Sequence, residues 1–412
     1  MIELDAGRAQ LLADCPRPEP VAVPTAEAAG CVLAEDVVAR FAVPPFDNTS
    51  LDGYAVRAVD LAGAGPDSPV TLQVLGAVPA GHVATGPVGA GQAWKVMTGA
   101  PLPPGADTVV MVEHSSATAT DPRDQPGQSV QLFDAPAAGV GVRPAGSDVS
   151  AGELVFGAGT VLRAAHLGVL ASVGAASVPV WPRLRVGVLM TGDELVCEPR
   201  PLQPGEIYES NRAMLTALVS AANCVPIDLG VVGDSVPALR RRLAEAIAEC
   251  DVIITSGGVS MGDADPVKAA LAELGRLNWL QLAIRPAKPF AYGVLDGPTL
   301  LLGLPGNPVS SLVSFQLMAA PALRQMMGHP EVLPRLIPAV AAVDFGPPRG
   351  DGRTAFLRAR ARFAADGRLE ITPLSKQDSH QLAASAAADA LVAVPDGAQP
   401  RAGELVQALL LH

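Results

Sequence analysis

Two glycine-bearing segments of this chain have the features of anion-binding loops. The segment TLLLGLPGNPVSS, Thr299–Ser311, is a short apolar run followed by a Gly/Pro/Asn loop and a helix-like stretch. The segment DVIITSGGVSMGDAD, Asp251–Asp265, shows the same order of features. Where a buried parallel strand leads into a helix, the unpaired N–H groups of the first helical turn attract phosphate. The predicted substrate-binding residues are Ser256, Gly257, Gly258, Ser260 and Gly262 in one loop, and Gly303, Pro305, Gly306, Asn307 and Ser310 in the other. The alternative for Asp251–Asp265 is a tight turn in which an aspartate caps a helix.

Three carboxylates follow predicted strands and could hold a hard cation. Glu194 lies in MTGDELV, Asp234 in VVGDSVP, and Asp265 at the end of the second glycine loop. The loops at one edge of a parallel sheet converge, so these side chains could bind Mg²⁺ together. Each of them could equally cap a helix, because acidic residues serve both purposes.

Basic residues that could neutralise an anionic ligand are few. Arg285 and Lys288 lie in AIRPAKPF between two predicted strands, and a solvated turn is their alternative interpretation. Arg358, Arg360 and Arg362 alternate with small or apolar residues and would share one face of a strand. An ordinary solvated strand face explains Arg360 and Arg362 equally well. His380, which follows Ser379 in SKQDSH, is interpreted as part of a surface turn.

The elements that would position these residues alternate between strand and helix. This rhythm spans residues 182–328 and predicts a mostly parallel, doubly wound sheet with helices on both faces. Residues 43–145 are rich in Gly, Pro, Val and Thr and are predicted to form a β module. The module would be inserted between residues 1–42 and 146–181, two halves of one helix-containing domain. Short alternating strands follow in residues 329–412.

Composition narrows the possible partners and the compartment. The formal charge of −12 and the pI near 5.0 argue against binding to nucleic acid or to an anionic membrane. The five cysteines are widely spread without a CxxC pair, which is typical of a reducing compartment. The amino terminus lacks the pattern of a signal peptide, so a cytoplasmic location is expected.

The ordered motifs of the chain resemble those of the molybdopterin molybdenumtransferases, the family of bacterial MoeA and the gephyrin E domain. The matching segments lie in the family's order between residues 44 and 311, and SKQDSH is a weaker match farther on. The segments are PPFDNTSLDGYAVR, MTGAPLPPGADTVVMVE, RPAGSDVSAGEL, TGDELV, GEIYESNRAML, TSGGVSMGDAD, RPAKPF and GLPGNPVSS.

The resemblance implies an elongated four-domain subunit with an α/β molybdopterin-binding domain and a C-terminal β-barrel. It implies insertion of molybdate into the dithiolene of adenylylated molybdopterin, with Mg²⁺-dependent release of AMP. It further implies a homodimer in which the inserted module of one subunit faces the α/β domain of the other. The pterin adenylyltransferase is an expected partner. The functional residues by matching position are Asp52, Thr98, Glu194, Asp234, Asp265, Lys288, Arg358 and Ser379. Local sequence alone would make Asp52 an ordinary turn residue.

The chain departs from the family near its basic pair. The family commonly reads KPGKP where this chain has Arg285 to Pro289 as RPAKP, and a frequent lysine is Gln281 here. These changes affect the expected affinity for an oxyanion. Two rival functions stand beside this one. The first is the adenylyltransferase that makes the adenylylated pterin, or a related nucleotide-processing protein with the same α/β domain. The second is a dimeric scaffold that binds a partner peptide, a role found in the gephyrin branch.

Overall fold

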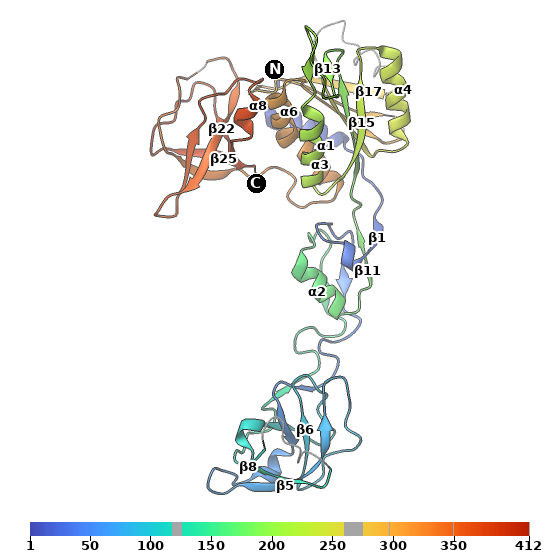
Figure 1. Cartoon of the computed structure of the whole chain (residues 1–412), viewed down its shortest axis with the longest axis vertical. Coiled ribbons are helices and arrows are strands. Elements are labelled where there is room, and N and C mark those ends of the chain that lie inside the picture. The colour runs from blue at the N-terminus through green and yellow to red at the C-terminus, as the bar shows by residue number, and fades with distance from the viewer. Residues whose placement is uncertain (118–125, 259–274, 296, 349, 412) are drawn as a thin grey trace.

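The computed structural model describes residues 1–117, 126–258, 275–295, 297–348 and 350–411. The molecule is elongated, with an α/β domain and a barrel side by side at one end and a β module at the other (Figure 1). A small unit built around β1, β11 and α2 lies between them. The multi-domain α/β and β organisation expected from the sequence is confirmed.

The central sheet of the α/β domain has the strand order β15-β12-β16-β20-β19-β17. Its parallel strands are β12 (Arg185–Thr191), β15 (Val225–Val232), β16 (Val252–Ser256) and β20 (Leu300–Leu304). The strands β19 (Pro289–Leu295) and β17 (Gly275–Gln281) complete it in antiparallel pairing. From β12 the chain first adds β15 on one side of it and then returns to add β16 on its other side. The direction in which strands are added therefore reverses between β12 and β16.

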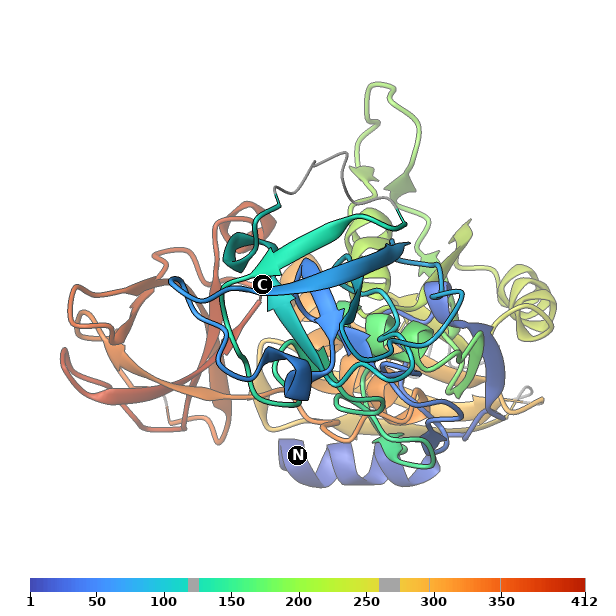
Figure 2. The ribbon, with the colours of Figure 1, turned by 90° about the horizontal axis from the view of Figure 1, so that it is seen from below.

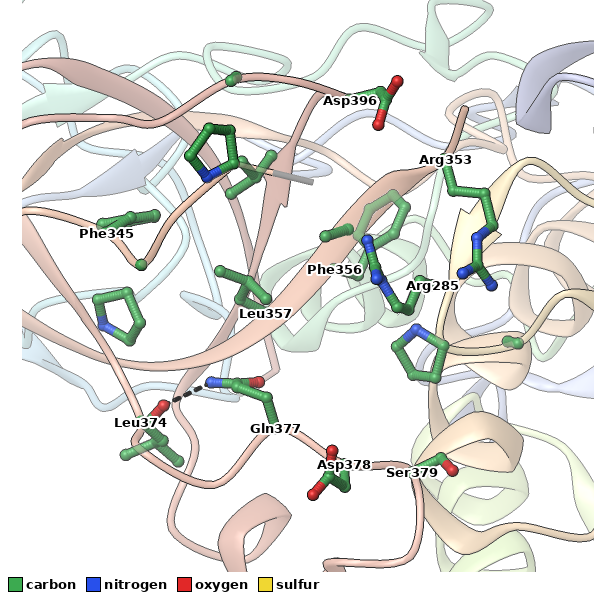
Figure 3. A pocket seen from close by; sticks show the side chains of 18 of the residues that line it. Arg285, Phe345, Arg353, Phe356, Leu357, Leu374, Gln377, Asp378, Ser379 and Asp396 are labelled. Atoms are coloured by element: carbon green, nitrogen blue, oxygen red, sulfur yellow. Dashed lines mark hydrogen bonds between the residues drawn. The ribbon is translucent and has the colours of Figure 1, made fainter. Parts of the chain in front are cut away.

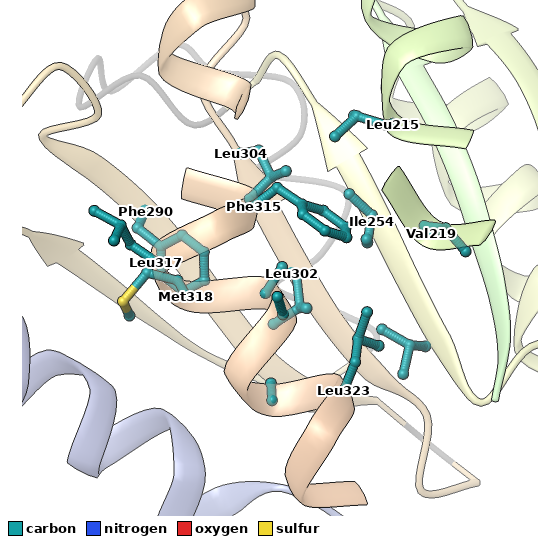
Figure 4. Close-up of a cluster of buried hydrophobic side chains, with 14 of the residues drawn as sticks. Leu215, Val219, Ile254, Phe290, Leu302, Leu304, Phe315, Leu317, Met318 and Leu323 are labelled. Atoms are coloured by element: carbon teal, nitrogen blue, oxygen red, sulfur yellow. The ribbon is translucent and has the colours of Figure 1, made fainter. Parts of the chain in front are cut away.

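Helices cover the sheet because their apolar stripes match buried strands. The helix α3 (Asn211–Ala221) presents Leu215 and Val219 to the core, and α4 (Val236–Ile247) buries Leu239 and Leu243 on the other face. The helix α6 (Pro308–Ser314) continues through a π-helical turn, Phe315–Ala319, into α7 (Ala320–Met326). Figure 4 shows this core, in which side chains of β16, β19 and β20 interdigitate with those of α3 and the α6–α7 segment.

The small unit in the middle joins two distant parts of the chain. The strand β1 (Val21–Pro24) pairs with β11 (Ser177–Val180), and β2 (Val37–Val38) pairs with β10 (Leu154–Phe156). The helix α2 (Ala164–Ser172) packs on the same core. Strands from both expected halves of the discontinuous domain therefore lie together.

The first helix differs from this expectation. The helix α1 (Leu4–Asp14) packs against α7 and β19 of the α/β domain, with Leu11 fully buried there. Arg8 donates a hydrogen bond of 2.8 Å to the Leu317 carbonyl in the π-helical turn. The main chain of Ile2 pairs with Leu282, which fixes the start of the chain on the α/β domain.

The inserted module is a five-stranded sheet of order β7-β4-β6-β5-β8. Its strands are β4 (Gly53–Val56), β5 (Val70–Val78), β6 (Gln92–Val96), β7 (Thr108–Met111) and β8 (Ser129–Leu132). The short pair β3 (Asn48–Thr49) and β9 (Val142–Arg143) closes its base. Two buried clusters, one on each face of the sheet, hold the module together.

The C-terminal domain is a closed five-stranded barrel, as expected. It consists of β21 (Ile337–Ala341), β22 (Thr354–Phe363), β23 (Leu369–Pro373), β24 (Ala390–Val394) and β25 (Leu405–Leu410), and the β22–β24 pairing closes it. The two-residue strand β18 (Ile284–Arg285) extends from the α/β domain and pairs with β22. The view along the long axis shows the barrel at one side of the α/β domain (Figure 2).

The thiols and helices give two further facts. All five cysteines are free thiols. None of the helices in the described ranges combines the length and the apolar character needed to cross a bilayer.

Candidate functional site

The two glycine loops meet at one edge of the central sheet. Ser256 at the end of β16 is in register with Leu304 at the end of β20, and the Gly257 N–H donates to the Leu304 carbonyl at 3.1 Å. The Ser256 hydroxyl donates to the Pro305 carbonyl at 3.2 Å. The edge is the carboxyl end of the parallel strands beside the point where the winding reverses, which is where open α/β sheets bind ligands.

A cavity of about 730 Å³ opens at this edge, and we term it the sheet-edge cavity. Its lining includes Gly257, Gly258, Gly306 and Asn307 of the predicted loop residues. Gly303 lies within β20, and Pro305 offers its carbonyl to Ser256. Ser260, Gly262 and Asp265 lie outside the described residues, so the second half of one loop has no structural account. The described parts of the two loops form one rim.

Asn211 holds the two loops against each other. Its Nδ2 group donates to the Gly306 carbonyl at 2.7 Å and to the Ser256 hydroxyl at 2.9 Å. A carbonyl accepts only from a donor, so these contacts fix which end of the Asn211 amide is the nitrogen. The Asn211 Oδ1 and Thr191 Oγ1 atoms are buried in the lining and have no partner within the described structure. Buried polar atoms in a cavity wall are groups that a ligand could satisfy.

Two of the three predicted metal ligands, Glu194 and Asp234, line the sheet-edge cavity. The Asp193 carboxylate accepts the Asp234 backbone N–H at 2.9 Å and so fixes the loop after β15. Within the described ranges, no group of three or more His, Cys, Asp or Glu side chains is arranged to hold a metal by itself. Two carboxylates beside a phosphate-binding rim nevertheless fit Mg²⁺, which is commonly held by one or two carboxylates together with substrate phosphates.

A second cavity of about 860 Å³ lies between the α/β domain and the barrel, and we term it the interdomain cavity. Its lining includes the predicted residues Arg285, Lys288, Ser310 and Ser379. Figure 3 shows Arg285 and Arg353 converging beside Phe356, with Ser379 farther along the wall. Ser310 lies in α6, directly after the loop that contains Gly306, and is buried, whereas Lys288 is exposed. The predicted substrate residues are thus divided between two neighbouring cavities.

The two predicted basic residues of the interdomain cavity, Arg285 and Lys288, differ in their surroundings. Arg285 pairs with Asp351 at 3.0 Å, and Arg353 pairs with the same carboxylate at 2.6 Å. The hydrogen bond from Arg353 and the charge of Arg285 hold the pKa of Asp351 below its ordinary value. The charge of Arg285 is therefore partly compensated. Ala287, between Arg285 and Lys288, adopts a φ of 78°, a conformation that costs a non-glycine residue about 1–2 kcal/mol.

The position of Arg358 does not match the prediction that its side chain contacts an anion directly. The side chain is only 1% exposed and lies in neither cavity wall. Its guanidinium donates to the carbonyls of Lys376, Asp378 and Gln381 at 2.8–3.1 Å and to the Ser385 hydroxyl at 3.2 Å. Burial lowers the pKa of Arg358. The residue organises the SKQDSH segment, because a buried guanidinium needs such acceptors.

The predicted residues Asp52 and Thr98 lie together in the inserted module, far from both cavities of the same chain (Figure 1). The Thr98 backbone N–H and hydroxyl donate to the Asp52 carboxylate at 2.6 and 2.8 Å. These hydrogen bonds, the backbone one foremost, and the charge of Lys95 lower the pKa of Asp52. One subunit alone does not bring this pair to the other predicted residues.

The fold brings to the site several residues that no sequence pattern assigns to it. Asn211 had a signal, because it lies in the quoted motif GEIYESNRAML. His380 lies in an exposed turn, as expected from the sequence, and it also lines both cavities, which the sequence does not indicate. Arg353 and Asp351 precede β22 and carry no motif, so only the pairing of β18 with β22 reveals them.

Comparisons with known proteins cover nearly the whole chain. Residues 2–174 match the MoeA N-terminal region (domain I and II), residues 187–325 a probable molybdopterin binding domain, and residues 339–411 the MoeA C-terminal region (domain IV). A molybdopterin molybdenumtransferase of Haemophilus influenzae is 36% identical over 93% of this chain and 92% of its own length. Molybdopterin molybdenumtransferase 2 of Mycobacterium tuberculosis is 38% identical over 92% of this chain and 91% of its own.

Solved structures agree with these matches. A structure of the molybdopterin biosynthesis MoeA protein from Pyrococcus horikoshii OT3 has a TM-score of 0.78 at 30% identity and covers 100% of both chains. The similarity therefore extends over all the domains described above. The chain belongs to the molybdopterin molybdenumtransferases, a family of transferases in molybdenum cofactor biosynthesis.

Proposed function

We propose that this protein inserts molybdate into the dithiolene of adenylylated molybdopterin and releases AMP in a Mg²⁺-dependent reaction. The observation that carries the proposal is the sheet-edge cavity, where Gly257 and Gly306 meet beside Glu194 and Asp234. A glycine rim suits a phosphate, and carboxylates next to it suit a divalent cation on that phosphate. The names of the relatives support the same substrate class.

Each of the two cavities would bind one of the two substrates. The adenylylated pterin would occupy the sheet-edge cavity, where Asn211 Oδ1 and Thr191 Oγ1 can meet polar groups of the ligand. Molybdate would occupy the interdomain cavity near Lys288, Ser310 and Ser379. Lys288 supplies a compact positive charge, and the two hydroxyls donate hydrogen bonds to the oxyanion.

Glu194 and Asp234 would hold Mg²⁺, with Asp265 as the expected third carboxylate. A bound Mg²⁺ would neutralise charge on the phosphoanhydride that links the pterin to AMP. The protein's own contribution is to hold that linkage between the glycine rim and the carboxylates, so that water reaches it in one orientation.

The position of Asp52 and Thr98 supports a homodimer with a site shared between subunits. Within one chain this pair lies at the far end of the molecule from the cavities. The inserted module of a partner subunit would bring the pair to the site. A protein that makes the adenylylated pterin is the expected supplier of the substrate.

The proposal is tested by incubating the purified protein with adenylylated molybdopterin, molybdate and MgCl₂. AMP is measured by chromatography, and molybdenum cofactor is measured by activation of a cofactor-free molybdenum enzyme. We expect AMP and cofactor to form in equal amounts and only with Mg²⁺ present. Failure to form cofactor would contradict the proposal. Transfer of AMP from ATP to free molybdopterin, measured in parallel, would favour the adenylyltransferase alternative.

A further inference from the structure

The two cavities share a single lining residue among those described, His380. All other lining residues of the sheet-edge cavity belong to the α/β domain, between Met190 and Pro308. His380 is therefore the contribution of the C-terminal domain to that cavity. It stands at the boundary between the proposed pterin site and the proposed molybdate site.

The backbone on both sides of His380 is held by hydrogen bonds. Buried Arg358 donates to the carbonyls of Lys376, Asp378 and Gln381. The Ser379 carbonyl accepts the Val309 N–H of α6 at 3.1 Å, and the His380 carbonyl accepts the Leu382 N–H at 3.0 Å. The segment is thus anchored both to the barrel and to the first turn of α6. A residue fixed in this way is preorganised for a task at the boundary.

The chemistry of the proposed function requires proton movement at that boundary. When a dithiol binds molybdate, R(SH)₂ + MoO₄²⁻ gives [R(S)₂MoO₃]²⁻ + H₂O. Two S–H bonds and one Mo–O bond break, while two Mo–S bonds and two O–H bonds form, and molybdenum keeps its oxidation state. Both protons leave sulfur and reach the oxide that departs as water. A group that meets both substrates can move them.

We propose that His380 transfers these protons, accepting a proton from a dithiolene thiol and donating it to the departing oxide of molybdate. The inference rests on the proposed function and adds a catalytic residue to it. Imidazole suits the task because one ring nitrogen can accept a proton while the other donates. Lys288 and Ser379 line only the interdomain cavity, and Glu194 and Asp234 line only the sheet-edge cavity.

The test compares His380→Ala and His380→Gln with the wild type in two assays. One assay measures binding of adenylylated molybdopterin by fluorescence titration, and the other measures the single-turnover rate of cofactor formation. We expect both variants to bind the pterin within about twofold of the wild type and to form cofactor about 10²- to 10⁴-fold more slowly. Added imidazole should restore part of the rate to His380→Ala and none to the matched variant Lys288→Ala.

Each contrary outcome has a distinct meaning. A wild-type rate in His380→Ala would overturn the role of His380 and leave the proposed function standing. A parallel loss of pterin binding and rate, without rescue by imidazole, would show a structural role and also overturn the inference. Absence of cofactor formation by the wild-type protein would overturn the proposed function itself, and this inference with it.

Discussion

Arg358 acts on the candidate site through other residues. Its position two residues before solvent-exposed Arg360 on β22 could suggest a shared basic face, but the two side chains have opposite environments. Arg358 is buried and donates to four acceptors, whereas the Arg360 side chain is 58% exposed and pairs with Asp389 at 3.5 Å. The buried guanidinium holds Ser379 and His380 in place without touching either cavity.

The conservative change Arg358→Lys tests this role. Lysine keeps the charge but cannot span four acceptors with one ammonium group, so the SKQDSH segment should loosen. We expect the amides of Val309 and Leu382, which donate to this segment, to exchange with deuterium about 10- to 100-fold faster, since each lost charged hydrogen bond is worth about 1.5–3 kcal/mol. The matched change Arg360→Lys should leave both rates within about twofold. Unchanged exchange in Arg358→Lys would show that the segment does not depend on this guanidinium.

At the scale of elements, an arm between β13 (Leu195–Val196) and β14 (Ile207–Tyr208) stands away from the α/β domain (Figure 2). Its base lies in the wall of the sheet-edge cavity. Two hydrogen bonds of 2.7 Å join the Arg200 guanidinium to the Glu206 carboxylate, and the Tyr208 hydroxyl donates to the Arg200 carbonyl at 2.7 Å. The arm is therefore braced by polar contacts of its own.

The titration of Glu206 reports on this brace. Hydrogen bonds from Arg200 and from the Gln203 N–H lower the pKa of Glu206 from 4.5 to about 2. A lowered carboxyl pKa stabilises the fold fully above the ordinary value, and this stabilisation is lost as the pH falls through about 2. We expect carbon NMR to show Glu206 ionised at pH 4 and its midpoint to rise towards 4.5 in Arg200→Gln. The control Arg242→Gln, in α4, should leave the midpoint unchanged. An ordinary midpoint in the unaltered protein would mean that the arm is not braced in this way.

The elements with strong local patterns could be predicted from the sequence. The runs at β12, β16 and β20 are apolar because both faces of the sheet are covered, and the glycine loops follow them directly. The residues that depend on distant pairings could not be predicted. The pairing of β18 with β22 brings Arg353 to Arg285, and the hydrogen bond from the Val309 N–H of α6 to the Ser379 carbonyl holds the neighbouring His380 beside the cavities. The docking of α1 on the α/β domain likewise depends on packing against α7.

At the scale of the whole molecule, the length of the subunit separates residues that the family resemblance groups together. The Asp52–Thr98 pair lies in the module at one end, and both cavities lie at the other (Figure 1). The small central unit carries two strand pairs between them. A shared site in a two-fold symmetric dimer would resolve this separation.

Mixed dimers test the shared site. Asp52→Ala and Lys288→Ala alter different ends of the subunit, so a dimer carrying one of each should retain one intact site out of two. We expect purified mixed dimers with two affinity tags to form cofactor at about half the wild-type rate, well above either single variant. The control pairs Lys288→Ala with Glu194→Ala, which lie in the same half, and should show no recovery. If the first mixture also shows none, each site is built from one chain.

The most direct measurement of the central claim is binding of adenylylated molybdopterin to Gly257→Ala. Gly257 has a φ of 98°, and a Cβ there would lie 2.7 Å from the Thr191 carbonyl oxygen, so alanine must displace the loop. The control Gly168→Ala lies in α2, where a Cβ meets nothing within 4 Å. The account predicts that fluorescence titration will show a Kd raised at least about tenfold for Gly257→Ala and unchanged for Gly168→Ala. Wild-type affinity in a folded Gly257→Ala protein would contradict a pterin site at this edge of the sheet.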